Sequence, residues 1–340
     1  MRDLENPFQI VHGELRDVPV SAFAIVKDEM YYLRSFLDHH RKLGVDQFII
    51  LDDQSSDGTR EFLVAQHDCL VLGSPFKFGE RVPEPWSGRE QRAGIVFKTM
   101  IPQQFLGNRY ALYLDADEYL VLPPGVGSVG ALFEILARND VQSVAANLID
   151  FFPASVAEMD VPRSLPTSEE MLGAHPYFDA VQLLSWHAGE TEPRENLENA
   201  STRLFREHKV KAVPGRMAGA PRWFNRLMPY KYPTTTVLKT PIVRWSPGVA
   251  YVNSHYANVP PARNVLLGLA HCKFTYDLSR RTNYALASKA YVRGSRKYQW
   301  YEELLDSMRR GKGSFLGPKT RRFQGPADLA DAGLIQFELA

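Results

Sequence analysis

The strand–helix alternation near the N-terminus constrains the fold of this chain more than any other sequence feature. Apolar runs at 20–26 and 47–51 are predicted to be buried strands. Between them, apolar residues recur at helical spacing over 30–43, and Gly44 stands where a helix commonly ends. A further helix is predicted over 59–66. Strands that alternate with helices form right-handed βαβ units, so the sequence predicts an α/β fold with a parallel sheet.

The rest of the chain continues this alternation less regularly. Further strands are predicted at 110–114, 141–149, 201–205 and 237–245, and further helices at 89–100, 277–291 and 296–310. Glycine and proline break the pattern over 73–88, which predicts a long loop, and 162–186 reads as irregular. The tail from Gly311 is predicted to be loosely held. We expect a main domain over 1–275 and a C-terminal helical extension over 276–340 packed on it.

Composition narrows the class of protein. The chain has 340 residues, 44% of them hydrophobic, which is enough for one large α/β domain with an appendage. A net charge of +1 gives no reason to expect a nucleic acid partner. Cys69 and Cys272 are too few for a disulfide scaffold, and they fit a reducing compartment. No signal peptide or transmembrane run is evident, so we predict a cytoplasmic protein with at most peripheral contact at the inner membrane.

A short acidic motif follows the predicted strand at 110–114. Asp115 and Asp117 lie two residues apart, and Glu118 follows them. Two carboxylates at a strand end can lean toward one cation, and Mg²⁺ or Mn²⁺ shares carboxylates with substrate phosphates. The alternative is a solvated turn, because short acidic motifs are common.

Acidic residues recur where other predicted strands end. They lie at 27–29, at 52–53 and at Asp150. Ligands of open parallel sheets bind beyond the carboxyl ends of the strands, so these acids and the motif at 115–118 are expected on one rim. Each close like-charged pair there would cost on the order of 4 kcal/mol at an effective dielectric near 20, and a bound divalent cation would reverse that sign.

The order of these motifs resembles the bacterial glycosyltransferase family 2-like enzymes of GT-A fold. The resemblance covers roughly residues 20–305 and rests on Val26-Lys27-Asp28-Glu29, Leu51-Asp52-Asp53-Gln54-Ser55-Ser56-Asp57-Gly58-Thr59, Leu114-Asp115-Ala116-Asp117-Glu118-Tyr119-Leu120 and His271-Cys272-Lys273-Phe274. This chain has Asp28 where the family usually has Asn, and Cys272 where the subgroup more often shows an aromatic residue. The resemblance implies a central, mostly parallel sheet flanked by helices, a UDP- or GDP-sugar donor, Mn²⁺ or Mg²⁺, and a glycan or lipid-linked acceptor.

The resemblance also implies roles for individual residues. Asp115, Asp117 and His271 are the expected metal ligands. The donor is expected to contact Val26, Lys27, Glu29, Asp52, Asp53, Arg89, Arg92, Asp115 and Lys273, with Asp52 or Asp53 at the base or ribose and Lys273 at a phosphate. A solvated basic face is the alternative role for Arg89 and Arg92.

An inverting enzyme of this kind needs a carboxylate base, because the pKa of an acceptor hydroxyl lies far above 7. Asp150 is the first candidate, since it ends the strand after the metal motif. Glu192 and Asp179 are the others, and no spacing rule chooses among them.

Several remaining residues have structural explanations. His40 shares a helical face with Phe36, which predicts packing or hydrogen bonding for His39 and His40 rather than a metal pair. His255 either lines the site or is structural. The basic and aromatic run at 293–312 is predicted to be a solvated helix with an aromatic core stripe, and the alternative is weak contact with a membrane surface or lipid-linked acceptor.

Together with the resemblance, these patterns predict a metal-dependent, inverting glycosyltransferase that acts on a surface polysaccharide or glycolipid precursor. A non-catalytic relative that binds nucleotides or glycans is one alternative. A sugar nucleotidyltransferase is another, although it would want a glycine-rich phosphate loop near the first strand, which 26–30 lacks. A Rossmann dehydrogenase is disfavoured because no Gly-x-Gly-x-x-Gly follows a strand.

Overall fold

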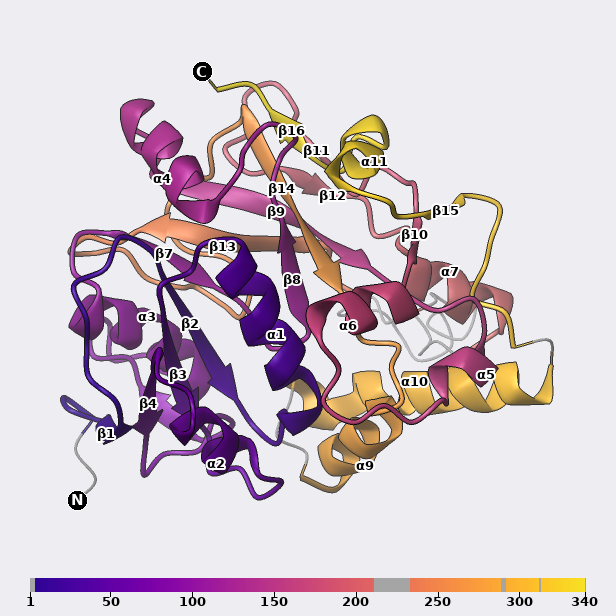
Figure 1. Ribbon diagram of the computed structural model, residues 1–340, viewed down its shortest axis with the longest axis horizontal. Coiled ribbons are helices and arrows are strands. Elements are labelled where there is room, and N and C mark those ends of the chain that lie inside the picture. The colour runs from indigo at the N-terminus through magenta and orange to yellow at the C-terminus, as the bar shows by residue number, and fades with distance from the viewer. Residues whose placement is uncertain (1–3, 211–232, 289–291, 312, 340) are drawn as a thin grey trace, which may run out of the picture.

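A ten-stranded mixed sheet runs through the molecule with helices on both faces (Figure 1). The computed structural model describes residues 4–210, 233–288, 292–311 and 313–339. The strand order is β1-β4-β3-β2-β7-β13-β9-β14-β16, and β8 also pairs with β14. These strands are β1 (Gln9–His12), β2 (Ser21–Val26), β3 (Gln47–Asp52), β4 (Cys69–Gly73), β7 (Tyr110–Tyr113), β8 (Glu118–Val121), β9 (Ser143–Asp150), β13 (Leu238–Arg244), β14 (Val265–His271) and β16 (Gln336–Phe337). The predicted α/β class is confirmed, with a mixed sheet.

Helices account for most of the remaining regular structure. They are α1 (Met30–Lys42), α2 (Thr59–Val64), α3 (Ala93–Phe105), α4 (Val129–Arg138), α5 (Val156–Met159), α6 (Ser168–Ala174), α7 (Ala200–Glu207), α9 (Leu278–Ser288), α10 (Val292–Arg310) and α11 (Pro326–Asp331). Within the described ranges, none of them is long and apolar enough to cross a membrane.

Alternating side chains along the strands build two hydrophobic cores, one on each face of the sheet. In β2, Ala22 and Ala24 belong to the core that also contains the buried face of α1, whereas Phe23 belongs to the core under α3. In β7, Leu112 faces the first core and Tyr113 the second. Successive side chains of a strand point to opposite faces, so strands covered on both sides are apolar throughout. This is why the runs at 20–26 and 47–51 could be recognised in the sequence.

The directions of the strands bring several strand ends to one edge of the sheet. β2 is parallel to β3 and β7, and β9 is parallel to β14. β13 lies antiparallel between β7 and β9, so β7 and β9 point the same way. The carboxyl ends of β2, β3, β7, β9 and β14 therefore share an edge with the amino end of β13. The predicted common rim is confirmed.

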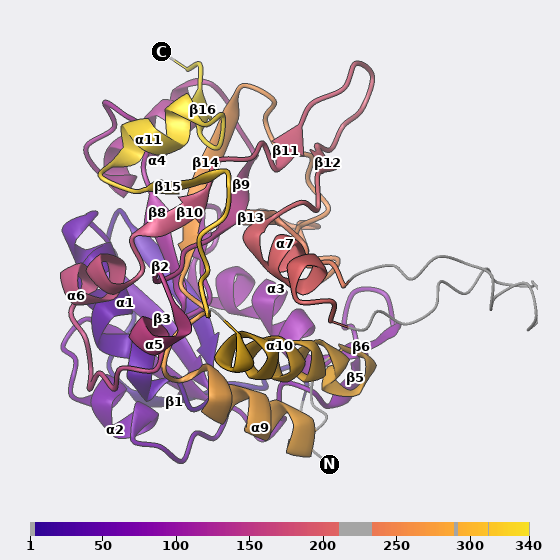
Figure 2. The ribbon, with the colours of Figure 1, turned by 90° about the vertical axis from the view of Figure 1, so that its right-hand side faces the viewer.

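A third, smaller core joins helices from distant parts of the chain. It contains Leu204 of α7, Met159 of α5, and Tyr301 and Leu304 of α10. Helices α9 and α10 contact each other and lie at the same end of the molecule in both ribbon views (Figure 2). In the run at 293–312, the buried Tyr301 and the partly buried Trp300 form the predicted aromatic core stripe.

One predicted element was wrong, and two others differ from the structure in extent. The expected strand at 201–205 is part of α7, whose N-cap Asn199 accepts a hydrogen bond from the amide of Thr202. Such a short apolar run does not distinguish a strand from a helix. The expected helix at 89–100 begins only at Ala93. It is preceded by a hairpin of β5 (Arg81–Pro83) and β6 (Glu90–Arg92), which falls partly in the predicted loop.

Regular structure also occupies the segment predicted to be irregular and the tail predicted to be loose. The former contains α6 and parts of two small sheets, and the latter continues into α11 and β16. The small sheets pair β10 (Tyr177–Asp179) with β15 (Thr320–Arg322) and β11 (Leu184–Ser185) with β12 (Arg194–Glu195). β16 pairs with β14 in the main sheet, and Leu329 and Leu334 are buried in the first core. The segment after residue 276 is therefore not only helical.

Shortening Ile335 in this tail should lower the free energy of unfolding. Its side chain is 5% exposed, so Ile335→Val removes a buried methyl group, and we expect a loss of about 1 kcal/mol in urea unfolding. Ile10→Val is the matched control, because that side chain is 51% exposed. Equal stability of the two variants would show that the tail is not docked on the core.

Candidate functional site

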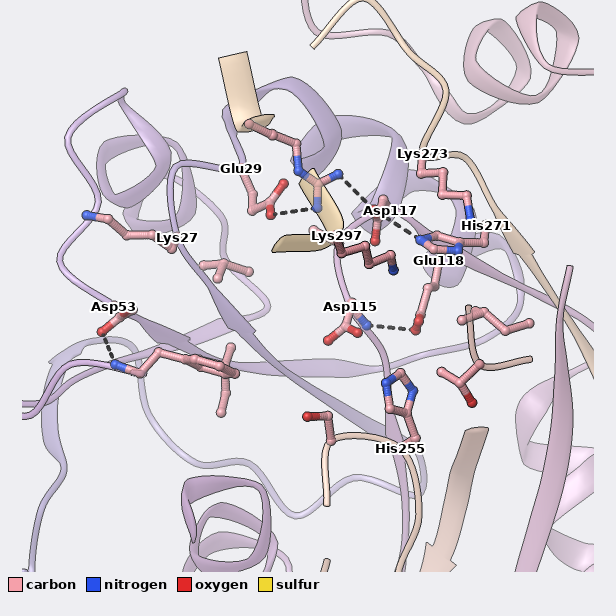
Figure 3. Close-up of a pocket in the computed structure, with 18 of the residues that line it drawn as sticks. Lys27, Glu29, Asp53, Asp115, Asp117, Glu118, His255, His271, Lys273 and Lys297 are labelled. Atoms are coloured by element: carbon pink, nitrogen blue, oxygen red, sulfur yellow. Dashed lines mark hydrogen bonds and ion pairs between the residues drawn. The ribbon is translucent and has the colours of Figure 1, made fainter. Parts of the chain in front are cut away.

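A pocket of about 320 Å³ lies at the edge of the sheet where the strand ends meet (Figure 3). A volume near 300 Å³ or above is typical of small-molecule sites. Of the residues singled out in the sequence, those that line the pocket include Val26, Lys27, Glu29, Asp53, Arg92, Asp115, Asp117, Glu118, His255, His271 and Lys273. Most of the predicted contact residues are thus brought together.

The motif at 115–118 forms a tight, internally bonded turn. The amide of Asp115 donates to Glu118 Oε2 at 2.9 Å, and Tyr113 donates its hydroxyl to Asp115 Oδ1. Lys239, at the start of β13, donates to both Asp115 and Glu118 although its side chain is fully buried. Burial raises the pKa of Glu118 to about 8 despite Lys239, whereas Lys239 and Lys98 outweigh burial and lower the pKa of Asp115.

Asp117 lies between a guanidinium and an imidazole. Arg281 of α9 donates to Asp117 Oδ2 at 2.8 Å and lies 3.5 Å from Glu29 Oε1. His271 Nε2 lies 3.3 Å from the same Asp117 oxygen. Although burial opposes ionisation, Arg281 and His271 hold the pKa of Asp117 well below its usual range. Burial raises the pKa of Glu29 to about 8 against the opposing charge of Arg281.

Three buried polar atoms of pocket-lining residues have no hydrogen-bond partner among the described residues. They are His271 Nδ1, which lies 3.9 Å from Asp150 Oδ1, Glu29 Oε2 and His255 Nδ1. Burial lowers the pKa of His271, which favours the neutral imidazole with a free lone pair. In the described part of the chain, no group of three or more His, Cys, Asp and Glu side chains is arranged to hold a metal ion. Asp117 and His271 could supply two ligands of a cation whose other ligands come from a substrate.

The three predicted base candidates do not line the pocket. Asp150 is buried and accepts from Lys273 at 2.5 Å and from the amide and hydroxyl of Ser201. These partners lower the pKa of Asp150, and the ion pair with Lys273 indicates that Asp150 positions this lysine.

Asp179 and Glu192 also lie outside the pocket lining. Asp179 is buried against the guanidinium of Arg203, which donates to it at 2.7 Å, and the hydroxyl of Thr320 donates to it as well. Glu192 is exposed in the loop between β11 and β12.

Two of the predicted donor contacts are likewise outside the lining, whereas their neighbours are inside it. Asp52 is buried and paired with Arg60 at 2.5 Å, and Arg89 is exposed on the β5–β6 hairpin. Asp53 accepts from the amide of Phe78 at 3.0 Å, and burial raises its pKa to about 6. The backbone therefore turns Asp53 and Arg92 toward the pocket.

The loop that carries Lys27 and Glu29 is held by Asp28. This residue has a left-handed backbone with φ of +53°, which Asp tolerates better than most residues do. Its carboxylate accepts from the amide of Ser56 at 2.6 Å, so the first two motifs are fastened to each other.

Sequence reasoning missed four cations at the site. Three of them, Lys98 of α3, Arg281 of α9 and Lys297 of α10, line the pocket, and Lys239 lies under the acidic motif. The detectable signal was a lysine within an otherwise apolar segment, as at Lys98 and Lys239. Nothing comparable marked Arg281 and Lys297, which lie on polar helices.

The histidine pair of α1 has the predicted structural role. His40 Nδ1 bonds the carbonyl of Phe36 at 2.8 Å, and its Nε2 accepts from the amide of Leu120. His39 Nε2 bonds the carbonyl of Leu120 at 2.8 Å.

Comparison with known proteins does not assign this site to a family. No family model matches the chain, and no curated protein matches it.

Proposed function

We propose that this protein is a metal-dependent glycosyltransferase that moves a sugar from a UDP- or GDP-sugar to an acceptor hydroxyl on a glycan or lipid-linked precursor. One observation carries the proposal. Asp117 and His271, which are far apart in the sequence but lie at the ends of the paired strands β8 and β14, meet in a pocket whose lining also includes Lys27, Asp53 and several basic side chains. Acidic ligands beside cations suit a metal-bound diphosphate.

The residues present fit a divalent cation. Asp117 offers a carboxylate held ionised, and His271 places its imidazole Nε2 3.3 Å from that carboxylate. Mg²⁺ commonly uses one or two carboxylates together with substrate phosphates. When bound, Mn²⁺ or Mg²⁺ would act as a Lewis acid on the charge that grows on the departing diphosphate.

The chain's own groups would perform the remaining chemistry. The acceptor oxygen bonds to the anomeric carbon as the bond to the diphosphate breaks, and the hydroxyl proton passes to a carboxylate. Glu29 and Glu118 line the pocket with pKa values near 8, close to what a general base requires. We therefore propose them in place of Asp150, Glu192 and Asp179.

The first test is thermal unfolding with a panel of nucleoside diphosphates, each with Mn²⁺ and with EDTA. We expect one nucleotide to stabilise the protein only with metal, by about 2.7 kcal/mol at 100 times its dissociation constant. Release of that nucleoside diphosphate from its sugar conjugate would show turnover. Metal-dependent binding without turnover would favour the non-catalytic alternative, and no stabilisation by any nucleotide would contradict the proposal.

A further inference from the structure

Three basic side chains in the pocket form no ion pair with a carboxylate of the described residues. They are Arg92 at the N-cap of α3, Lys98 further along the same helix, and Lys297 of α10. In the described ranges, no carboxylate forms an ion pair with any of the three, whereas Arg281, Lys239 and Lys273 each have one. The sequence outside the described ranges contains a single acid, Asp3.

Lys98 shows the lack of an ion pair most clearly. Its side chain is 2% exposed, and its ammonium donates to the carbonyl of Ser254 at 3.0 Å and lies 4.3 Å from the centre of the Tyr113 ring. Neither contact is with an anion, and the carboxylates whose charges act on Lys98, Asp115 and Glu118, are both bonded to Lys239. Burial accordingly lowers the pKa of Lys98 to about 8. A buried ammonium is costly unless it is paired, so this position favours a ligand that brings negative charge.

Arg92 and His255 belong to the same part of the pocket as Lys98. The Arg92 side chain is half-buried, and both burial and the neighbouring Arg81 lower its pKa. Burial and the charges of Lys98, Lys239 and Lys297 lower the pKa of His255 to about 3, so its ring is neutral. Its buried Nδ1 has no hydrogen-bond partner. A neutral imidazole can donate one N–H to an anion.

In the rest of the pocket, the basic side chains form ion pairs with the carboxylates, so Arg92, Lys98 and Lys297 are not needed to neutralise them. Lys239 pairs with Asp115 and Glu118, Lys273 pairs with Asp150, and Arg281 pairs with Asp117 and Glu29. A divalent metal with a nucleoside diphosphate would add little net charge. The positive charge around His255 is therefore only partly offset, by Asp115.

We propose that Arg92, Lys98 and Lys297 form an anion subsite that binds a phosphate or carboxylate group of the substrate without help from a metal. Arginine binds such groups with two parallel hydrogen bonds, and the two lysines add point charges. The subsite deepens the proposed function, on which the identity of its natural ligand rests. That ligand is either the donor diphosphate or a further anionic group on the transferred sugar or the acceptor.

The test uses sodium pyrophosphate as probe, in EDTA, with sodium chloride at equal ionic strength as reference. We expect pyrophosphate to raise the unfolding temperature of the full chain. Arg92→Gln and Lys297→Gln should each weaken pyrophosphate binding about tenfold, and Lys98→Met should abolish it. If Lys98→Met fails to fold, the other two variants decide the question.

Matched controls lie on the same elements. Arg89→Gln, on the β5–β6 hairpin, and Arg310→Gln, on α10, remove exposed charges outside the pocket lining and should leave pyrophosphate binding unchanged. No stabilisation beyond that of sodium chloride would overturn the subsite. Equal losses in the controls and the pocket variants would also overturn it, because they would show a diffuse charge effect.

A second arm separates the two sources of the anion. If the donor diphosphate occupies the subsite, Arg92→Gln and Lys297→Gln should also weaken nucleoside diphosphate binding in Mn²⁺. If a further anionic group occupies it, that binding should be unchanged, and a UDP-uronate should bind the wild type more tightly than its neutral hexose counterpart. Pyrophosphate binding in a protein that binds no nucleotide would retain the subsite and reject the proposed function.

Discussion

Asp117→Asn is expected to abolish metal-dependent nucleotide binding and to lower the transfer rate about a thousandfold or more. The substitution keeps the size of the side chain but removes the charge that would hold the cation. Lewis-acid stabilisation of a leaving diphosphate is worth several kcal/mol, and each 1.36 kcal/mol corresponds to a factor of ten in rate. The rate of nucleoside diphosphate release from the sugar donor, measured at saturating Mn²⁺, checks this expectation.

Two controls separate loss of the metal from loss of the fold. Asp117 is also paired with Arg281 and His271, so the variant should be compared with the wild type by circular dichroism and urea unfolding. Asp331→Asn removes an exposed charge at the end of α11 and should leave the rate unchanged. An Asp117→Asn protein that transfers sugar at the wild-type rate, with no loss in EDTA, would show that Asp117 does not hold a catalytic metal.

Arg203→Met should cost about 3–5 kcal/mol of unfolding free energy, the largest stability effect that we predict. Arg203 and Asp179 are 10% and 5% exposed, and the guanidinium also donates to the carbonyl of Phe315 at 2.6 Å. Removing one member of a buried ion pair leaves the other charged and unpaired, which is the costly case. Urea unfolding measures the loss.

Arg194→Met is the matched control, because its ion pair with Glu190 lies at the surface, where solvent screens the charges, and its loss should change stability far less. Arg203→Met combined with Asp179→Leu should recover part of the lost stability, since it removes the stranded carboxylate. Equal losses from Arg203→Met and Arg194→Met would refute the buried-pair account.

The same pair distinguishes two roles of Asp179. A catalytic base would lose most of its rate in Asp179→Asn while the protein stayed folded. We expect the reverse, with reduced stability and a wild-type rate in the folded fraction, because Asp179 lies outside the pocket lining.

Local patterns in the sequence were sufficient for the elements that present the site. The strand at 20–26, the helix at 30–43 and the acidic motif at 115–118 were placed correctly because their periodicities are long or their neighbours strongly apolar. The common rim then followed from the rule that parallel strands end at one edge. Short segments such as 201–205 failed, because a few apolar residues suit a helix as well as a strand.

The sequence by itself determined the α/β class and the rim, and most of the contact residues that it predicted line the pocket. Only the tertiary structure decided which charged side chains at the site pair with one another. Asp150 is bound to Lys273 and Asp179 to Arg203, whereas Lys98 and Arg92 lack acidic partners in the described part of the chain. Such pairings join residues far apart in sequence, and their strength depends on distance and burial. Neither quantity leaves a local pattern in the chain.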